Sequence, residues 1–207
     1  MSHRITRRAR AAIIAAAVTT AALTLGACSA PASDVPETTG ATASDEPGDP
    51  ALAALGLEDA DARTLIDTLD ALPLDERPTD LMASIRPDEV LVTTESGETS
   101  IPMPEDAFYV SFAPYVDSTH DCYFHSLTTC TGELGDEEVQ VLVTDAATGE
   151  VLIDETRTTF ANGFVGLWLP RDIQATLTVT YDGLTATQEL STANADDATC
   201  VTTMQLA

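Results

Sequence analysis

From residue 89 onward the chain consists of short segments in which apolar and polar residues alternate, separated by turn residues. Alternation with a period of two places apolar side chains on one face of a β-strand, and short strands at intervals of about ten residues are typical of an antiparallel sandwich. Asp182-Gly183 between two such segments is a strong signal for a hairpin. The expected strands are 89–94, 99–104, 108–116, 138–146, 150–160, 163–170, the two arms of 174–190 and 198–206.

Helical periodicity precedes the strands. Six apolar residues in 51–72 recur at intervals of three and four: Leu52, Leu55, Leu65, Ile66, Leu69 and Leu72. This spacing predicts one or two amphipathic helices that end at Pro73, and a short helical turn is expected at 79–85. The predicted fold class is α+β, with a short N-terminal helical segment at 51–88 followed by an antiparallel β-sandwich, the β-rich domain at 89–207.

The first 27 residues resemble an export signal. Four arginines precede the apolar stretch 11–25, which is shorter than the roughly 20 residues that a membrane-spanning helix needs. Leu25-Gly26-Ala27-Cys28 resembles a bacterial lipobox, so we predict a lipoprotein signal peptide at 1–27 and lipidation of Cys28. The alternative is an ordinary secretory signal with an incidental cysteine. Either interpretation predicts an extracytoplasmic protein, periplasmic or at the cell surface, and the first limits membrane contact to a lipid anchor.

The rest of the chain is strongly acidic. Residues 28–50 are rich in Ser, Thr, Pro, Asp and Gly, which predicts a disordered tether. The chain has no lysine, and without residues 1–27 it keeps five arginines against 34 carboxylates, a formal charge of −29. Such a field repels phosphate backbones, so nucleic-acid binding is excluded. We interpret the acidity mainly as an aid to solubility.

Export matters for the cysteines, because disulfides persist outside the cytoplasm. If Cys28 carries the lipid, Cys122, Cys130 and Cys200 remain, and an odd number leaves one thiol after one disulfide has formed. A disulfide between Cys122 and Cys130 that staples a loop is one interpretation, with Cys200 as a small buried residue. The other interpretation is that the three sulfurs bind a metal ion.

The second interpretation depends on the segment THDCYFHSLTTC, residues 119–130. His120 and Cys122 share a face if the segment is extended, and a compact loop would return Cys130 toward Cys122. If the last strand docks beside this loop, Cys200 joins the group. Met204 follows Cys200 by four residues and so lies on the same face of that strand. Thiolates select Cu(I) and also suit zinc, and His125 or His120 would add an imidazole. Each histidine also has an ordinary structural interpretation.

Three longer segments carry a family resemblance. They are FAPYVDSTHDCYFHSLTTCTGELGDEEVQVLVTDAATGEVL, TRTTFANGFVGLWLPRD and DDATCVTTMQL, and the similarity extends roughly over residues 50–207. Together they resemble the CueP family of periplasmic copper-binding proteins, whose motif cysteines fall on Cys122, Cys130 and Cys200.

The resemblance implies copper binding outside the cytoplasm, copper tolerance, and delivery of copper to an exported Cu/Zn superoxide dismutase. It also implies reduction of Cu(II) by the cysteines and an N-terminal segment that forms a homodimer. We therefore predict a copper-binding protein, not an enzyme, with Cys122, Cys130 and Cys200 as ligands, His125 as an accessory ligand and His120 as a weaker candidate. The alternatives are an extracellular thiol–disulfide protein or a structural sandwich with a stapled loop.

Overall fold

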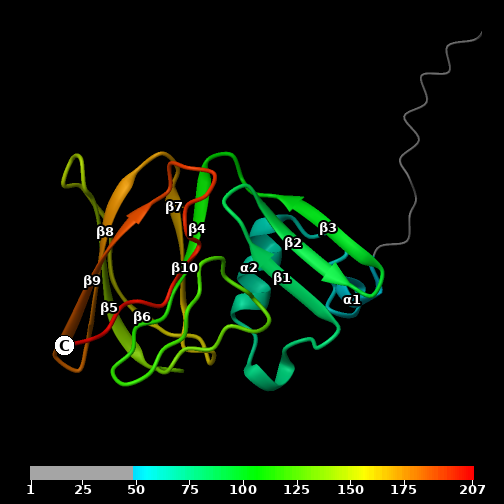
Figure 1. Cartoon of the computed structure of the whole chain (residues 1–207), viewed down its shortest axis with the longest axis horizontal. Coiled ribbons are helices and arrows are strands. Elements are labelled where there is room, and N and C mark those ends of the chain that lie inside the picture. Colours follow the sequence, from blue (N-terminus) through cyan, green and yellow to red (C-terminus); the bar gives the residue numbers. More distant parts are fainter. Residues whose placement is uncertain (1–48) are drawn as a thin grey trace, which may run out of the picture. The chain divides into compact units, whose positions relative to one another are not determined.

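The structure is a computed structural model that describes residues 49–207, and within them the predicted α+β fold is confirmed (Figure 1). The expected signal peptide 1–27, the lipidation site Cys28 and nearly all of the expected tether lie outside the described residues. None of the helices in 49–207 is long and apolar enough to cross a membrane.

The N-terminal part consists of short helices and a three-stranded sheet. Its elements are α1 (Pro50–Ala54), α2 (Ala62–Asp70), the 3-10 helix η1 (Leu74–Glu76), β1 (Leu81–Ile85), β2 (Glu89–Thr94) and β3 (Gly97–Pro102). The strands pair antiparallel in the order β1-β2-β3. The helices expected in 51–72 are confirmed, and the side chain of Asp61 caps α2 by accepting a hydrogen bond from the backbone N–H of Thr64 at 2.8 Å.

The helical turn expected at 79–85 is wrong. Residues 81–85 form β1, in which Leu81, Ala83 and Ile85 are buried while Met82 between them is 60% exposed. This alternation has the period of a strand, and pairing with β2 satisfies the backbone of the segment. Pro78 and Pro87 therefore lie on either side of a strand, not of a helical turn.

The C-terminal part is a sandwich of two sheets. One has the order β10-β4-β7 and the other the order β6-β5-β8-β9. The strands are β4 (Ala107–Phe112), β5 (Glu138–Asp145), β6 (Val151–Thr158), β7 (Val165–Pro170), β8 (Gln174–Tyr181), β9 (Leu184–Ser191) and β10 (Cys200–Val201). Pairing is antiparallel except between β10 and β4, which run parallel. One hydrophobic core joins the facing surfaces of both sheets.

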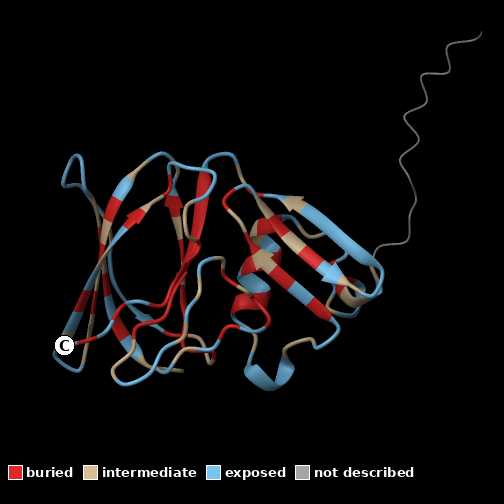
Figure 2. Cartoon of the chain, viewed as in Figure 1, coloured by how far each residue is buried: buried red, intermediate tan, exposed pale blue. Residues whose placement is uncertain are grey.

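Strand β4 is buried along its whole length because both of its faces are covered (Figure 2). Phe108, Val110 and Phe112 point into the sandwich core. Tyr109 lies in the second core, which contains the buried face of α2 and the β1–β3 sheet. Because successive side chains on a strand alternate between its faces, β4 joins the two halves of the fold, and its outer face brings polar groups next to α2.

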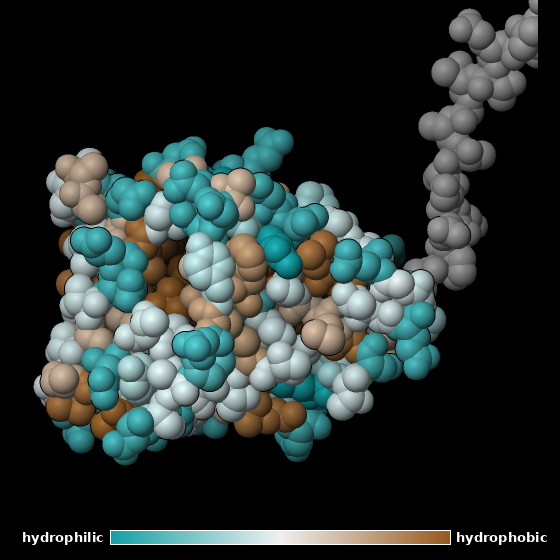
Figure 3. Space-filling view, in the orientation of Figure 1, coloured by the Kyte–Doolittle hydropathy of each residue, from teal (hydrophilic) through white to brown (hydrophobic). Residues whose placement is uncertain are grey.

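Hydrophilic and hydrophobic side chains both reach the surface of the part that the structure describes. Figure 3 shows one face on which hydrophilic and hydrophobic side chains are interspersed. The exposed large apolar side chains belong to four different segments: Leu74, Met82, Tyr123 and Val151. Single exposed apolar side chains are normal on a protein surface and do not by themselves indicate an interface. Dimerisation through residues 51–88 therefore stays a prediction.

Candidate metal centre

The loop between β4 and β5 carries most of the predicted ligands, and backbone hydrogen bonds fix it on two sides. The N–H of Ile85 at the end of β1 donates to the carbonyl of His125 at 2.8 Å. The N–H of Cys200 in β10 donates to the carbonyl of Tyr123 at 3.0 Å. The loop therefore lies between the β1–β3 sheet and the last strand of the sandwich.

The last strand meets the loop, which was the condition for Cys200 to join the other two cysteines. Cys122 and Cys200 form a disulfide with a Cα–Cα distance of 5.7 Å. Cys130 is a buried free thiol whose Sγ lies 3.5 Å from Sγ of Cys122. The expected alternative of a Cys122–Cys130 staple is wrong for this structure, because β10 pairs with β4 at the root of the loop and brings Cys200 directly onto Cys122.

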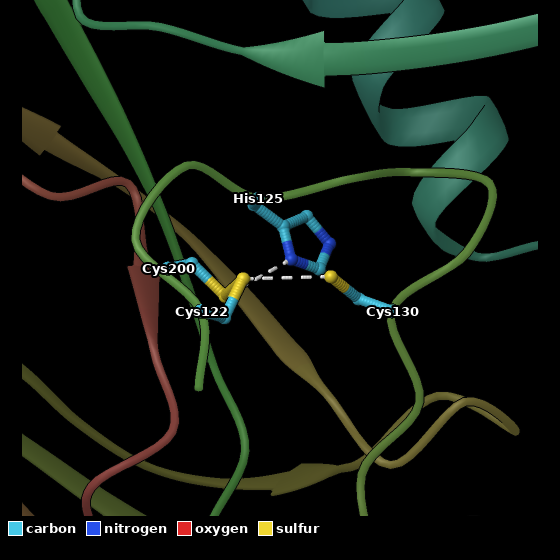
Figure 4. A group of neighbouring side chains, drawn as sticks. All are labelled: Cys122, His125, Cys130 and Cys200. Atoms are coloured by element: carbon cyan, nitrogen blue, oxygen red, sulfur yellow. Dashed lines mark hydrogen bonds between the residues drawn. A yellow bond between two sulfur atoms is a disulfide. The ribbon is translucent and has the colours of Figure 1, made fainter. Parts of the chain in front are cut away.

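His125 completes a group of four donors. Its ring is fully buried, and its Nδ1 lies 3.6 Å from Sγ of Cys200. One ligand atom from each of Cys122, His125, Cys130 and Cys200 lies within 4.8 Å of the others, and Figure 4 shows the imidazole turned toward the sulfurs. Once the Cys122–Cys200 disulfide is reduced, three thiolate sulfurs and one imidazole nitrogen would form a donor set that Cu(I) and zinc both accept.

The predicted candidate His120 and the nearby residue Met204 lie outside this group of four. His120 is partly exposed, packs edge-on against Phe164 at 6.2 Å between ring centroids, and buries its Nε2 without a hydrogen-bond partner. Met204 is 1% exposed and belongs to the sandwich core. Met204 is thus a packing residue, and His120 is at most a neighbour of the group.

Sequence reasoning missed the carboxylate beside His125. Oδ1 of Asp70, the last residue of α2, lies 2.9 Å from Nε2 of His125, and both side chains are fully buried. Asp70 follows Ile66 by four residues, so it sits on the buried side of the helix that the periodicity had defined. A charged residue at an apolar position of that pattern was the available signal.

Arg77 is a second residue that the sequence did not single out. Its Nη1 donates to the backbone carbonyl of Cys130 at 2.7 Å, which holds the end of the ligand loop. Its Nε and Nη2 are buried without a hydrogen-bond partner. Burial lowers the pKa of Arg77, and the nearby Asp70 and Cys130 oppose that shift. Arg77 therefore places positive charge near Cys130 and Asp70.

The buried charges change the protonation of the site. Burial lowers the pKa of His125, but the charge of Asp70 and its hydrogen bond, assisted by Cys130, raise it to about 9. Burial raises the pKa of Cys130, but the hydrogen bond and charge of His125 dominate and lower it to about 7. Burial likewise raises the pKa of Asp70, and His125, Tyr109 and Ser111 outweigh it, so the net shift is downward. A thiolate next to an imidazolium is therefore favoured at neutral pH.

Comparison with known proteins assigns the chain to a family. No curated protein sequence matches the chain. A family described as "Periplasmic copper-binding protein CueP" matches residues 64–205, a span that includes all four donors and Asp70. A solved structure titled "Crystal Structure of S.CueP" is 37% identical, with a TM-score of 0.70 over 75% of this chain and 94% of that one. The chain belongs to the CueP family of periplasmic copper-binding proteins.

Proposed function

We propose that this protein binds Cu(I) outside the cytoplasm through the thiolates of Cys122, Cys130 and Cys200, with His125 as an additional ligand. The observation that carries the proposal is the convergence of these four donors within 4.8 Å in a largely buried site. Soft sulfur ligands suit Cu(I), which also accepts two or three ligands, so loss of the imidazole would leave a usable trigonal set.

The same sulfurs would reduce Cu(II). Two Cu(II) ions accept one electron each from the thiolates of Cys122 and Cys200, which join as a disulfide, and any thiol protons are released. Balanced, two Cu(II) and two thiolates give two Cu(I) and one disulfide. Support comes from the Cys122–Cys200 disulfide, with Cys130 and His125 left beside it as donors for Cu(I). A separate reductant must then restore the thiols.

The physiological role follows from the family resemblance. The protein would buffer copper and contribute to copper tolerance, and it would hand Cu(I) to an acceptor such as an exported Cu/Zn superoxide dismutase. His125 would act as an accessory ligand or as the residue that captures Cu(II), and the partly exposed His120 is the weaker candidate. Lipidation at Cys28 would keep the protein at the membrane surface.

Anaerobic titration of the reduced protein tests the metal and the ligands together. Cu(I) and Zn(II) are each titrated against a competing chelator, because three cysteines and a histidine also form a known type of structural zinc site. We expect preference for Cu(I) in the wild type. We also expect Cu(I) binding to be weaker in each of Cys122→Ser, Cys130→Ser and Cys200→Ser. The loss should exceed roughly 100-fold, because removing only a residue that hydrogen-bonds to a metal ligand already weakens metal binding roughly 10–100-fold. Zinc preference, or wild-type affinity in all three variants, would refute the proposal.

A thiol–disulfide protein is the second candidate function. The observation in its favour is that Sγ of the free Cys130 lies 3.5 Å from Sγ of Cys122 in the disulfide. A Cys130 thiolate placed there can attack the Cys122 sulfur and release Cys200. This candidate predicts reduction of insulin by the reduced protein above the rate of a Cys122→Ser control, whereas the copper proposal predicts equal background rates.

A further inference from the structure

Asp70 occupies a position where a carboxylate is unfavourable. Its side chain is 0% exposed, and burying an isolated carboxylate costs roughly several kcal/mol. It is also the last residue of α2, where the partial negative charge of the helix C-terminus opposes an acid. An apolar residue would suit both the helix and the core better, so the contacts of Asp70 must explain its presence.

Three side chains from the sandwich hold the carboxylate in place. The hydroxyl of Tyr109 donates to Oδ2 at 2.7 Å, and the hydroxyl of Ser111 donates to the same oxygen at 3.0 Å. Nδ2 of Asn162 donates to Oδ1 at 3.1 Å and to the backbone carbonyl of Asp70 at 2.9 Å. Because none of these three partners carries a positive charge, they fix the orientation of the carboxylate without neutralising it.

The remaining contact is the one with His125. Oδ1 of Asp70 lies 2.9 Å from Nε2 of the ring, while Nδ1 on the other side of the ring lies 3.6 Å from Sγ of Cys200. A carboxylate accepts hydrogen bonds and cannot donate them, so Nε2 must carry the proton. In the neutral ring Nδ1 then has the lone pair, and it faces the sulfurs (Figure 4).

We infer that Asp70 is the positioning residue of the metal centre, which orients His125 so that Nδ1, and not Nε2, is presented to the ion. This inference rests on the proposed copper function and adds to it a residue that touches no ligand sulfur. A carboxylate on the far nitrogen of a metal-binding imidazole fixes both the tautomer and the ring plane. The site is therefore not confined to residues 89–207, because α2 supplies the group that aligns one of its ligands.

The test compares Cu(I) affinity in a double-mutant cycle of Asp70→Ala and His125→Ala. We expect Asp70→Ala to weaken Cu(I) binding roughly 10–100-fold in the wild-type background and to have no further effect once His125 is alanine. An equal loss in both backgrounds would overturn the inference, because Asp70 would then act through the fold alone. If Asp70→Ala fails to fold, Asp70→Ser serves in the same cycle, since its hydroxyl is too short to reach His125.

Two further variants separate orientation from charge and from helix stability. Asp70→Asn keeps an acceptor oxygen for His125, because the hydroxyls of Tyr109 and Ser111 can turn to accept from the new amide. We expect its Cu(I) affinity to be closer to wild type than that of Asp70→Ser, and equal losses would contradict an orienting role. Asp67→Ala is the matched control on the same helix. Its carboxylate accepts from Nε1 of Trp168 at 2.8 Å, and we expect unchanged Cu(I) affinity.

A measurement without copper keeps this inference separate from the proposed function. Nitrogen NMR of His125 in the metal-free protein at pH 10, where the ring is neutral, reports which nitrogen carries the proton. We expect a single Nε2–H tautomer with slow proton exchange in the wild type, and mixed tautomers or fast exchange in Asp70→Ser. The same spectra in both proteins would overturn the inference even if copper binds, whereas failure of the wild type to bind Cu(I) would overturn only the proposed function.

Discussion

Nε2 of His125 lies 2.9 Å from Oδ1 of Asp70, so the imidazole of the sandwich loop is bonded to the last residue of a helix 55 positions earlier in the chain. On the opposite side of the ring, Nδ1 lies 3.6 Å from Sγ of Cys200. One buried ring thus connects the two halves of the fold to the candidate metal centre.

The disulfide should depend on which cysteines are present. In the oxidised wild type, peptide mapping without reduction should recover Cys122 joined to Cys200. In Cys200→Ser, Cys122 should pair with Cys130, because the two sulfurs are already 3.5 Å apart. In Cys122→Ser we expect less of any intramolecular disulfide. A dominant Cys122–Cys130 pair in the wild type would contradict the first expectation.

Stability should depend on pH through two opposing groups. His125, with its pKa raised from 6.5 to about 9, contributes stability that is fully present below pH 6.5 and lost as the pH rises through 9. Cys130, with its pKa lowered from 9.0 to about 7, contributes stability that is present above pH 9 and lost as the pH falls through 7. Between pH 7 and 9 the two slopes cancel, so the unfolding free energy of the wild type should be nearly constant.

Removing the thiol should expose the contribution of His125. In Cys130→Ser the unfolding free energy should fall as the pH rises above 6.5, with a slope of at most about 1.4 kcal/mol per pH unit. The fall should end at a pH below 9, because part of the raised pKa of His125 comes from Cys130. Urea denaturation of both proteins from pH 6 to 10 measures this. The same flat profile in Cys130→Ser would show that His125 gains no proton on folding.

Gly166 should be needed for the hydrogen bond that supports Asp70. A Cβ at this position would overlap the hydroxyl of Tyr109 and lie 2.5 Å from its Cζ. Gly166→Ala should therefore displace Tyr109 and lower the unfolding free energy by about 1–3 kcal/mol in urea denaturation. In a Tyr109→Phe background the cost should be smaller, because the nearest overlapping atom is gone. Equal costs in both backgrounds would contradict the assigned cause.

His120 and His125 should differ in their effect on Cu(I) affinity. His125 lies within 4.8 Å of the three sulfurs and is fully buried, whereas His120 lies outside this group. In competition with a chelator, His125→Ala should weaken Cu(I) binding more than His120→Ala. Met204→Leu is the control, because Met204 packs in the sandwich core, and it should leave the affinity unchanged. A larger loss in His120→Ala would reverse the assigned order.

Local patterns in the sequence were sufficient to locate most elements. Alternation located the strands from β2 to β9 to within a few residues, and a spacing of three and four located α2. The strand expected at 198–206 is much shorter in the structure, where only β10 (Cys200–Val201) is formed. The patterns failed at β1, because the five residues of this strand carry too short a pattern to tell a strand from a helical turn, and pairing with β2 decided the outcome.

The sequence by itself determined which residues can act as metal ligands. They are the three cysteines after Cys28 and the two histidines of the segment 119–130. Only the tertiary structure decided how they combine. Cys122 pairs with Cys200 across 78 residues because β10 docks on β4, and Asp70 reaches His125 because α2 packs on the outer face of β4. Contacts between distant segments depend on how sheets and helices pack, and a period of two or 3.6 residues along the chain carries no information about that packing.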